Sequence, residues 1–140
     1  MKLGTVILNK MDDLDKAIEQ GIVPWTDMVV ELSDFHVTVF RDRYPVTPGH
    51  LLFVPRYQTQ GIITDCFDSA MRCGHDMVQR GECDAFNVGM NCGSAAGQTV
   101  PYPHIHLIPR RVGDCADPTG GIRAVVRGQA NYKSSDYKKP

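Results

Sequence analysis

Apolar residues recur along the chain with two different periods, which predict helices in some segments and strands in others. Between residues 62 and 80 they recur at nearly helical spacing, and Gly81 follows as a helix stop. A shorter helix is expected over residues 12–20, where acidic residues fill the first turn and Gly21 ends the segment. Gly74 weakens the longer helix by about 1 kcal/mol of helix propensity.

Short apolar or alternating segments, separated by turn residues, predict the strands. They cover residues 28–32, 36–41, 50–55, 85–90, 104–108 and 122–126. These strands do not alternate regularly with helices, so a parallel doubly wound sheet is not expected. The pattern favours an α+β domain with an antiparallel sheet, and the 140 residues suit a single domain.

The charge balance narrows the class of ligand. The formal net charge is −1 with histidine neutral. A chain without basic excess is a poor match for a nucleic-acid backbone, so we expect no nucleic-acid partner. Small phosphorylated ligands remain compatible with this balance, because a pocket needs local hydrogen-bond donors rather than global charge.

The cysteines and the N-terminal residues indicate a compartment. The five cysteines are odd in number and contain no Cys-x-x-Cys pair, which favours reduced thiols over disulfides or a zinc knuckle. The short apolar patch in residues 1–9 meets charges at Lys10, so it is too short for a signal peptide or a membrane span. We therefore expect a cytoplasmic protein without membrane contact.

The segment with the most chemical information surrounds two histidines. Side chains alternate between the two faces of a strand, so His104 and His106 share one face, with Tyr102 in the same parity. The preceding loop, residues 93–103, contains glycine and offers backbone N–H groups to an anion. Neutral imidazole is a good nucleophile, and two adjacent imidazoles can divide attack and leaving-group assistance between them.

The His-x-His spacing alone leaves three interpretations open. The pair can be structural, catalytic, or part of a metal site. A metal would require a third ligand, which His36 or His50 could supply.

Two longer motifs add a resemblance to a known family. The stretch GQTVPYPHIHLIPR (97–110) closely resembles the signature of the histidine-triad (HIT) superfamily, and FRDRYPVTPGHLLFVP (40–55) resembles its second motif, in which a Pro-Gly-His turn enters a strand. The resemblance covers about residues 25–127 of a single HIT-like domain spanning 1–140, with a polar tail over 128–140. It implies a five-stranded antiparallel sheet with one long and one short helix. It also implies a homodimer with a ten-stranded sheet.

The resemblance also implies roles for individual residues. His104 corresponds to the nucleophile that carries the nucleotidyl group covalently, and His106 to the histidine that contacts the phosphate and the leaving group. Further implied positions are Gln98, Thr99 and His50 in the catalytic cluster, Asn91 and Gly97 beside the phosphate, Asp42 at the ribose, and Phe40 and Leu52 at the base.

One position departs from the family pattern and another favours one reaction within it. Tyr102 replaces the first histidine of the triad, which bears on rate and fine specificity rather than on reaction type. Retention of His106 favours hydrolysis over nucleotidyl transfer.

The expected function is hydrolysis of nucleoside phosphate anhydrides or phosphoramidates, such as diadenosine polyphosphates or adenylyl compounds. No metal or cofactor is implied, except for Mg²⁺ arriving with the substrate. The alternatives are a transferase or phosphorylase using the same intermediate, and a weakly active nucleotide sensor.

Overall fold

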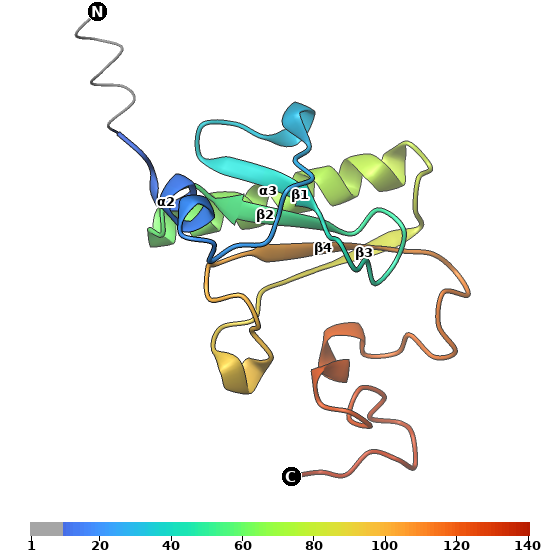
Figure 1. The fold of residues 1–140 in the computed structure, drawn as a ribbon. Helices are drawn as coiled ribbons and strands as arrows, with labels where there is room; N and C mark the ends of the chain where they lie inside the picture. The colour runs from blue at the N-terminus through green and yellow to red at the C-terminus, as the bar shows by residue number, and fades with distance from the viewer. Residues whose placement is uncertain (1–9) are drawn as a thin grey trace, which may run out of the picture.

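A computed structural model describes residues 10–140, so the apolar N-terminal patch lies outside the described residues (Figure 1). The regular elements include two helices and four strands, together with three 3-10 turns. They are α2 (Asp13–Glu19), η1 (Val30–Leu32), β1 (Val37–Arg41), β2 (Leu51–Pro55), α3 (Gln60–Gln79), β3 (Ala85–Gly89), η2 (Ser94–Ala96), β4 (Ile105–Arg110) and η3 (Gly121–Val125). The expected α+β class is confirmed.

The strands form one antiparallel sheet in the order β1-β2-β4-β3. The central pair, β2 and β4, brings the two sequence motifs side by side, because Leu52 lies opposite His106 in the ladder. The pairing thus carries the Pro-Gly-His turn to the histidine pair, although more than 50 residues separate them.

Helix α3 covers one face of this sheet (Figure 1). Alternate strand residues, among them Val39, Phe53 and Ile105, are buried beneath it. The glycine inside the helix allows its closest approach to β3, because a Cβ at Gly74 would lie 2.6 Å from the ring of Phe86. The residue that weakens helix propensity is therefore required by packing.

The opposite face holds a second apolar cluster beneath α2. Phe40, Leu52 and Tyr102 lie in it with Leu14 of the helix. Asp12 caps α2 by accepting from the backbone N–H of Asp15 at 2.8 Å. Arg56 joins this cap to the sheet, because its guanidinium binds Asp12, Asp15 and the Thr38 hydroxyl.

The prediction of a strand over residues 28–32 is wrong, apart from one bridging residue pair. Met28 forms an isolated bridge with Phe40, after which the chain enters the η1 turn. The hydroxyl of Ser33 replaces the ladder there, since it accepts from the Val39 N–H at 2.9 Å and donates to the Val29 carbonyl at 3.0 Å. The Ser33 side chain thus accepts the hydrogen bond from the Val39 N–H that a backbone carbonyl of a continuing strand would have accepted.

The strand expected over residues 122–126 is also wrong, because this segment forms η3. Gly120 and Gly121 both have positive φ, which turns the chain away from an extended course. The side chain of Arg123 then binds the carbonyls of Gln129 and Ala130, so the segment folds on itself. The sheet therefore has four strands among the described residues, and the expected number of five is incorrect.

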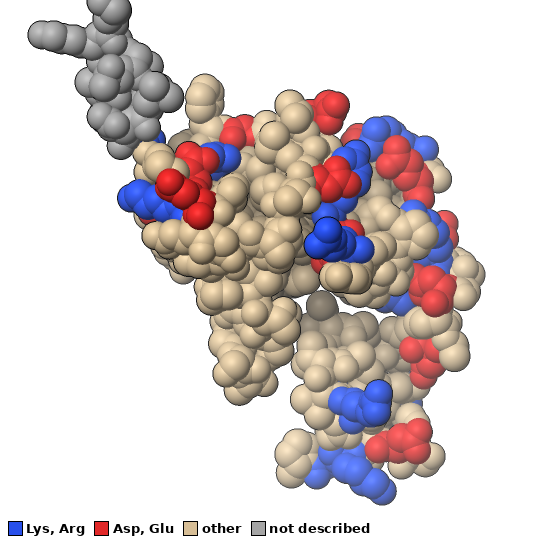
Figure 2. Space-filling model, in the orientation of Figure 1, with Lys and Arg blue, Asp and Glu red and all other residues tan. Residues whose placement is uncertain are grey.

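Charges do not separate by sign on the face drawn in Figure 2, where acidic and basic side chains intermingle. Of the helices in residues 10–140, none combines the length and apolar character needed to span a bilayer. The segment after β4 runs out from the sheet and returns below its open face (Figure 1).

Candidate active site

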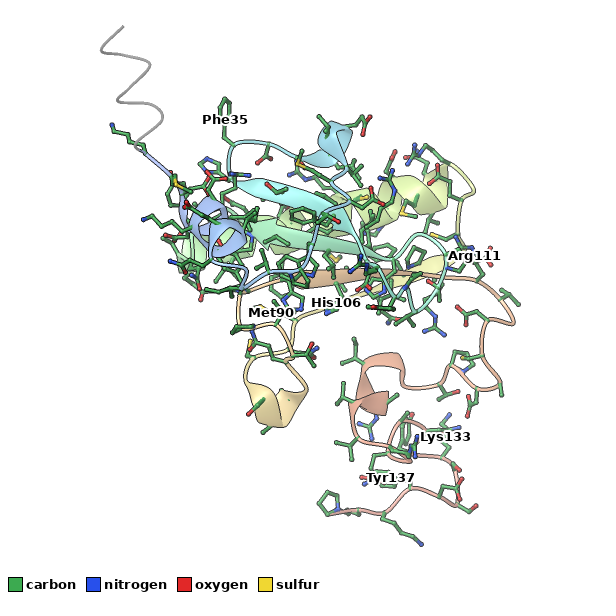
Figure 3. The ribbon with its side chains drawn as sticks, viewed as in Figure 1. Phe35, Met90, His106, Arg111, Lys133 and Tyr137 are labelled. Carbon is green, nitrogen blue, oxygen red and sulfur yellow. The ribbon has the colours of Figure 1, made fainter. Side chains whose placement is uncertain are left out.

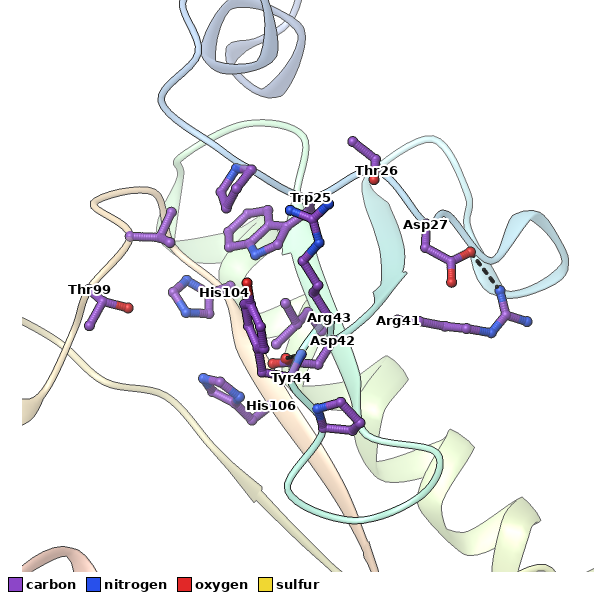
Figure 4. A pocket seen from close by; sticks show the side chains of 14 residues that line it. Trp25, Thr26, Asp27, Arg41, Asp42, Arg43, Tyr44, Thr99, His104 and His106 are labelled. Atoms are coloured by element: carbon purple, nitrogen blue, oxygen red, sulfur yellow. Dashed lines mark hydrogen bonds and ion pairs between the residues drawn. The ribbon is translucent and has the colours of Figure 1, made fainter.

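A cavity of about 750 Å³ opens on the sheet face opposite α3 (Figure 4). His104 and His106 lie on one of its walls, and Trp25 lies on another. The strand parity explains why both rings reach it, since Ile105 and Leu107 point into the core beneath α3. The two imidazole centroids are 5.1 Å apart, which confirms that the histidines share a face.

The backbone fixes the tautomer of His104. Its Nδ1 lies 2.8 Å from the carbonyl oxygen of Tyr102, which can only accept a hydrogen bond. Nδ1 therefore carries the proton, and Nε2 keeps its lone pair. The ring is buried and lines the cavity, so this lone pair is held in one orientation, as attack on a substrate would require.

Tyr102 sets this carbonyl in place. Its phenol donates to the carbonyl of Pro55 at 2.6 Å, and burial raises the pKa of Tyr102, so the hydroxyl keeps its proton. The bond to His104 uses the backbone of residue 102 rather than its side chain. The Tyr102 side chain thus anchors the segment whose backbone carbonyl accepts the hydrogen bond from His104.

A second chain of hydrogen bonds fixes the tautomers of His50 and His106. The backbone N–H of Val46 donates to Nδ1 of His50 at 3.1 Å, so a neutral His50 carries its proton on Nε2. This nitrogen lies 2.9 Å from Nδ1 of His106 and donates to it. His106 consequently carries its own proton on Nε2, and the loop backbone determines which atom of His106 is a donor.

Both of these imidazoles are held uncharged at neutral pH. Burial lowers the pKa of His106 to about 4, and the neighbouring His104 and His50 contribute to the lowering. Burial also lowers the pKa of His50, although the Asp42 carboxylate 3.6 Å away opposes that effect. His106 therefore offers a neutral N–H donor rather than a positive charge.

The structure places five of the expected residues around the 750 Å³ cavity: Asp42, Leu52, Thr99, His104 and His106. Asn91 and His50 lie instead around a second cavity of about 330 Å³, which His106 also lines. Leu52 forms part of the wall, whereas Phe40 packs behind Trp25 with their ring centroids 5.9 Å apart.

Two loop residues expected at the phosphate do not face either of these cavities. Gln98 uses its side-chain amide within its own loop, accepting from Gly93 at 2.8 Å and donating to Val100 at 3.0 Å. Gly97 is exposed and provides the left-handed turn of that loop. The loop does not offer the backbone N–H groups that the sequence predicted for an anion, because four of them are bonded within the loop: those of Gly93, Ala96, Gly97 and Gln98. Of the polar residues expected at the phosphate, Thr99 is the one that this loop places at the larger cavity.

Sequence reasoning did not identify Trp25, Arg43 and Tyr44, which also line the cavity. Trp25 packs edge-on against His104 at 4.9 Å between ring centroids, and offers an aromatic surface. It lies in an irregular segment without periodicity. Its only signal was that it is the single tryptophan of the chain, directly after a proline.

One group of potential metal ligands lies close together among residues 10–140. Donor atoms of Asp42, His50 and His106 fall within 4.8 Å of one another. The Val46 N–H occupies the Nδ1 lone pair of His50, so its Nε2 holds a proton and has no lone pair for a metal. The arrangement therefore suits a proton-ordering chain better than a metal centre. His36, the other proposed third ligand, is exposed and does not belong to this group.

The chain is similar to a known protein family and to several curated proteins. The model of the HIT domain matches residues 26–113. The bis(5'-nucleosyl)-tetraphosphatase [asymmetrical] of Schizosaccharomyces pombe is 34% identical over 97 residues, which cover 64% of this chain and 53% of that enzyme. The adenosine 5'-monophosphoramidase HNT1 of Saccharomyces cerevisiae is 33% identical over 75 residues, covering 51% of this chain and 48% of that enzyme. The chain thus spans about half the length of these relatives.

Solved structures share the fold. A Zn-bound histidine triad family protein from Mycobacterium smegmatis superposes with a TM-score of 0.59 at 28% identity, covering 72% of this chain and 76% of the other.

Proposed function

Because this chain belongs to the HIT domain family, we propose that it hydrolyses nucleoside phosphate anhydrides or phosphoramidates through a covalent nucleotidyl-histidine at His104. One observation carries the proposal. The bond from Nδ1 of His104 to the Tyr102 carbonyl leaves the Nε2 lone pair on a buried ring that lines the cavity. The names of the relatives, a nucleosyl tetraphosphatase and an adenosine phosphoramidase, support the substrate class.

In the first step, Nε2 of His104 attacks the α-phosphorus, a P–N bond forms, and the bond from phosphorus to the leaving atom breaks. The imidazole becomes a cation whose Nδ1–H remains bonded to the Tyr102 carbonyl, so this carbonyl stabilises the intermediate. Attack by water on the same phosphorus then releases a nucleoside monophosphate and restores neutral His104.

His106 contributes a directed hydrogen bond. Its Nε2–H, ordered by His50 and the Val46 backbone, is the donor for the oxygen or nitrogen that gains charge as its bond to phosphorus breaks. Since the ring is uncharged at neutral pH, the proton taken up by the leaving atom comes from water. No step in this scheme draws on a metal supplied by the chain.

The adduct provides the direct test. The protein is mixed with adenosine 5'-phosphoramidate or diadenosine tetraphosphate and quenched without acid, and its peptides are then analysed by mass spectrometry. A nucleotidyl group on the peptide containing His104 is expected. His104→Ala should lose at least about 10³-fold in kcat, as expected for the loss of a nucleophile.

The matched control is His36→Ala, which removes an exposed histidine ahead of β1. It should retain the parent rate, and circular dichroism should show that both variants are folded. Near-parent turnover by folded His104→Ala would refute the assignment. Product analysis with and without inorganic phosphate separates hydrolysis from phosphorolysis.

We also propose a homodimer in a reducing compartment such as the cytoplasm. Strand β3 forms one edge of the sheet, and an edge strand can pair with a second copy. The five cysteines are free thiols, which suits a reducing environment. Sedimentation of the purified chain at twice the monomer mass would support the dimer, whereas a monomer at micromolar concentration would refute it.

A further inference from the structure

We propose that Arg43 binds an anionic group carried by the nucleoside itself, namely a phosphate ester on the 2'- or 3'-oxygen of its ribose. This inference rests on the proposed nucleotidyl transfer to His104, and it names a further group on the substrate of the larger cavity. Arg43 lines that cavity from the loop between β1 and β2. The additional phosphate stays on the nucleoside, so the bonds that form and break at the α-phosphorus are those already described.

The charge of Arg43 has no partner within residues 10–140. The other arginine at the cavity, Arg41, is paired with Asp27 at 3.1 Å, whereas the side chain of Arg43 forms no ion pair or hydrogen bond there. The carboxylate between the two arginines is turned towards the chain. Its Oδ1 accepts from the Tyr44 N–H at 2.7 Å, and the Asp42 side chain is 17% exposed. This wall of the cavity therefore presents an uncompensated positive charge.

The position of Arg43 assigns this charge to the nucleoside rather than to the leaving group. His104 lies between Trp25 and His106, with ring centroids 4.9 Å and 5.1 Å from its own. In the proposed mechanism the leaving atom faces His106. Figure 4 shows the Arg43 side chain extending past Tyr44 towards Trp25, at the end of the cavity away from His106.

Thr26 offers a neutral donor at the same end of the cavity. It lines the cavity next to Trp25, and its hydroxyl makes no hydrogen bond among the described residues (Figure 4). A phosphate ester has several acceptor oxygens, so it can bind the guanidinium fork of Arg43 and a hydroxyl together. A ribose hydroxyl is uncharged, and one bond to it does not offset the cost of ordering a long arginine side chain.

The anion site depends on one side chain. Among residues 10–140, the basic residues that line the cavity are Arg41 and Arg43. Figure 3 shows Arg111 beyond the end of β4 and Lys133 in the C-terminal segment, and neither lines the cavity. Since Arg41 is already paired, a substitution of Arg43 removes the free cation and tests the inference directly.

Equilibrium binding tests the subsite without relying on turnover. Isothermal titration calorimetry compares adenosine 5'-monophosphate with adenosine 2',5'-bisphosphate and adenosine 3',5'-bisphosphate. The parent should bind one of the bisphosphates about tenfold more tightly than the monophosphate, because bonds from a guanidinium to a phosphate are charge-assisted. The bisphosphate with the larger gain identifies the ribose oxygen. Added salt should reduce this preference, since the Arg43 side chain is exposed.

Three variants separate the charge from its geometry and from general effects. Arg43→Gln removes the charge and should reduce the preference to about twofold or less. Arg43→Lys keeps the charge without the planar fork, so it should retain part of the preference. The matched control is Arg72→Gln, which removes an exposed arginine of α3, paired with Asp68 at 3.0 Å on the other side of the sheet. It should keep the parent preference.

Two results would refute the subsite: equal binding of all three nucleotides by the parent, or the same preference in the parent and Arg43→Gln. Rates then show whether the proposed function stands. Turnover of adenosine 5'-phosphoramidate without a preference that depends on Arg43 would keep the function and overturn this inference. A preference that depends on Arg43, without turnover of the phosphoramidate or its ribose-phosphorylated form, would support the anion site and overturn the proposed function.

Discussion

Replacing His106 by glutamine should remove a large part of the acid sensitivity of the fold. Burial and the neighbouring imidazoles lower the pKa of His106 to about 4 in the folded chain, against 6.5 for an ordinary histidine. As the pH falls below 6.5, the unfolded chain binds a proton that the folded chain still refuses. The stabilisation linked to neutral His106 is thus complete above pH 6.5 and is lost as the pH falls towards 4.

The size of the effect follows from the same two values. At 1.36 kcal/mol per pKa unit, the lowered pKa corresponds to about 3 kcal/mol, and residual solvent contact of the half-buried ring reduces it to about 2–3 kcal/mol. Urea unfolding at pH 7.5 and pH 4.5 measures the loss directly. The parent should lose about 2 kcal/mol more between these pH values than His106→Gln does.

The control for this comparison is His36→Gln, which removes an exposed imidazole ahead of β1 and should follow the parent. The reasoning is refuted if the parent and His106→Gln lose the same free energy of unfolding to within about 0.5 kcal/mol.

Two further substitutions test the packing around the site. Tyr102→Phe removes the buried hydroxyl that donates to the Pro55 carbonyl, so it should cost about 1–3 kcal/mol of stability and lower kcat with little change in KM. The ¹⁵N chemical shifts of the His104 ring would report a shift in its tautomer. An unchanged kcat would contradict the positioning role of Tyr102. Gly74→Ala should destabilise the protein by about 1–3 kcal/mol despite the better helix propensity of alanine, because the new Cβ meets the Phe86 ring at 2.6 Å. Gly61→Ala, in the same helix with no atom within 4 Å of the new Cβ, should be neutral or stabilising; equal thermal shifts in the two variants would contradict the packing argument.

Much of the fold can be predicted from local patterns. The expected helix over residues 62–80 is α3 to within two residues at each end, and the segments around residues 36–41, 50–55 and 85–90 are strands. In these segments one face of the helix or strand is buried, so the spacing of the apolar residues predicts both the type of element and its buried face. The segments at residues 28–32 and 122–126 carry the same apolar signal, but a serine hydroxyl and two glycines of positive φ end their pairing.

Part of the candidate site can likewise be predicted from the sequence, and the rest depends on the folded chain. The alternation of residues along one strand was sufficient to place His104 beside His106, and the two motifs pointed to His50 and Asp42. The proton positions on the three imidazoles follow from the Val46 N–H and the Tyr102 carbonyl, neither of which has a side-chain signature. Trp25, the second cavity and the inward-turned amide of Gln98 likewise depend on contacts between distant segments. Periodicity along the chain determines which side chains share a face, but only the folded chain decides which backbone groups they meet.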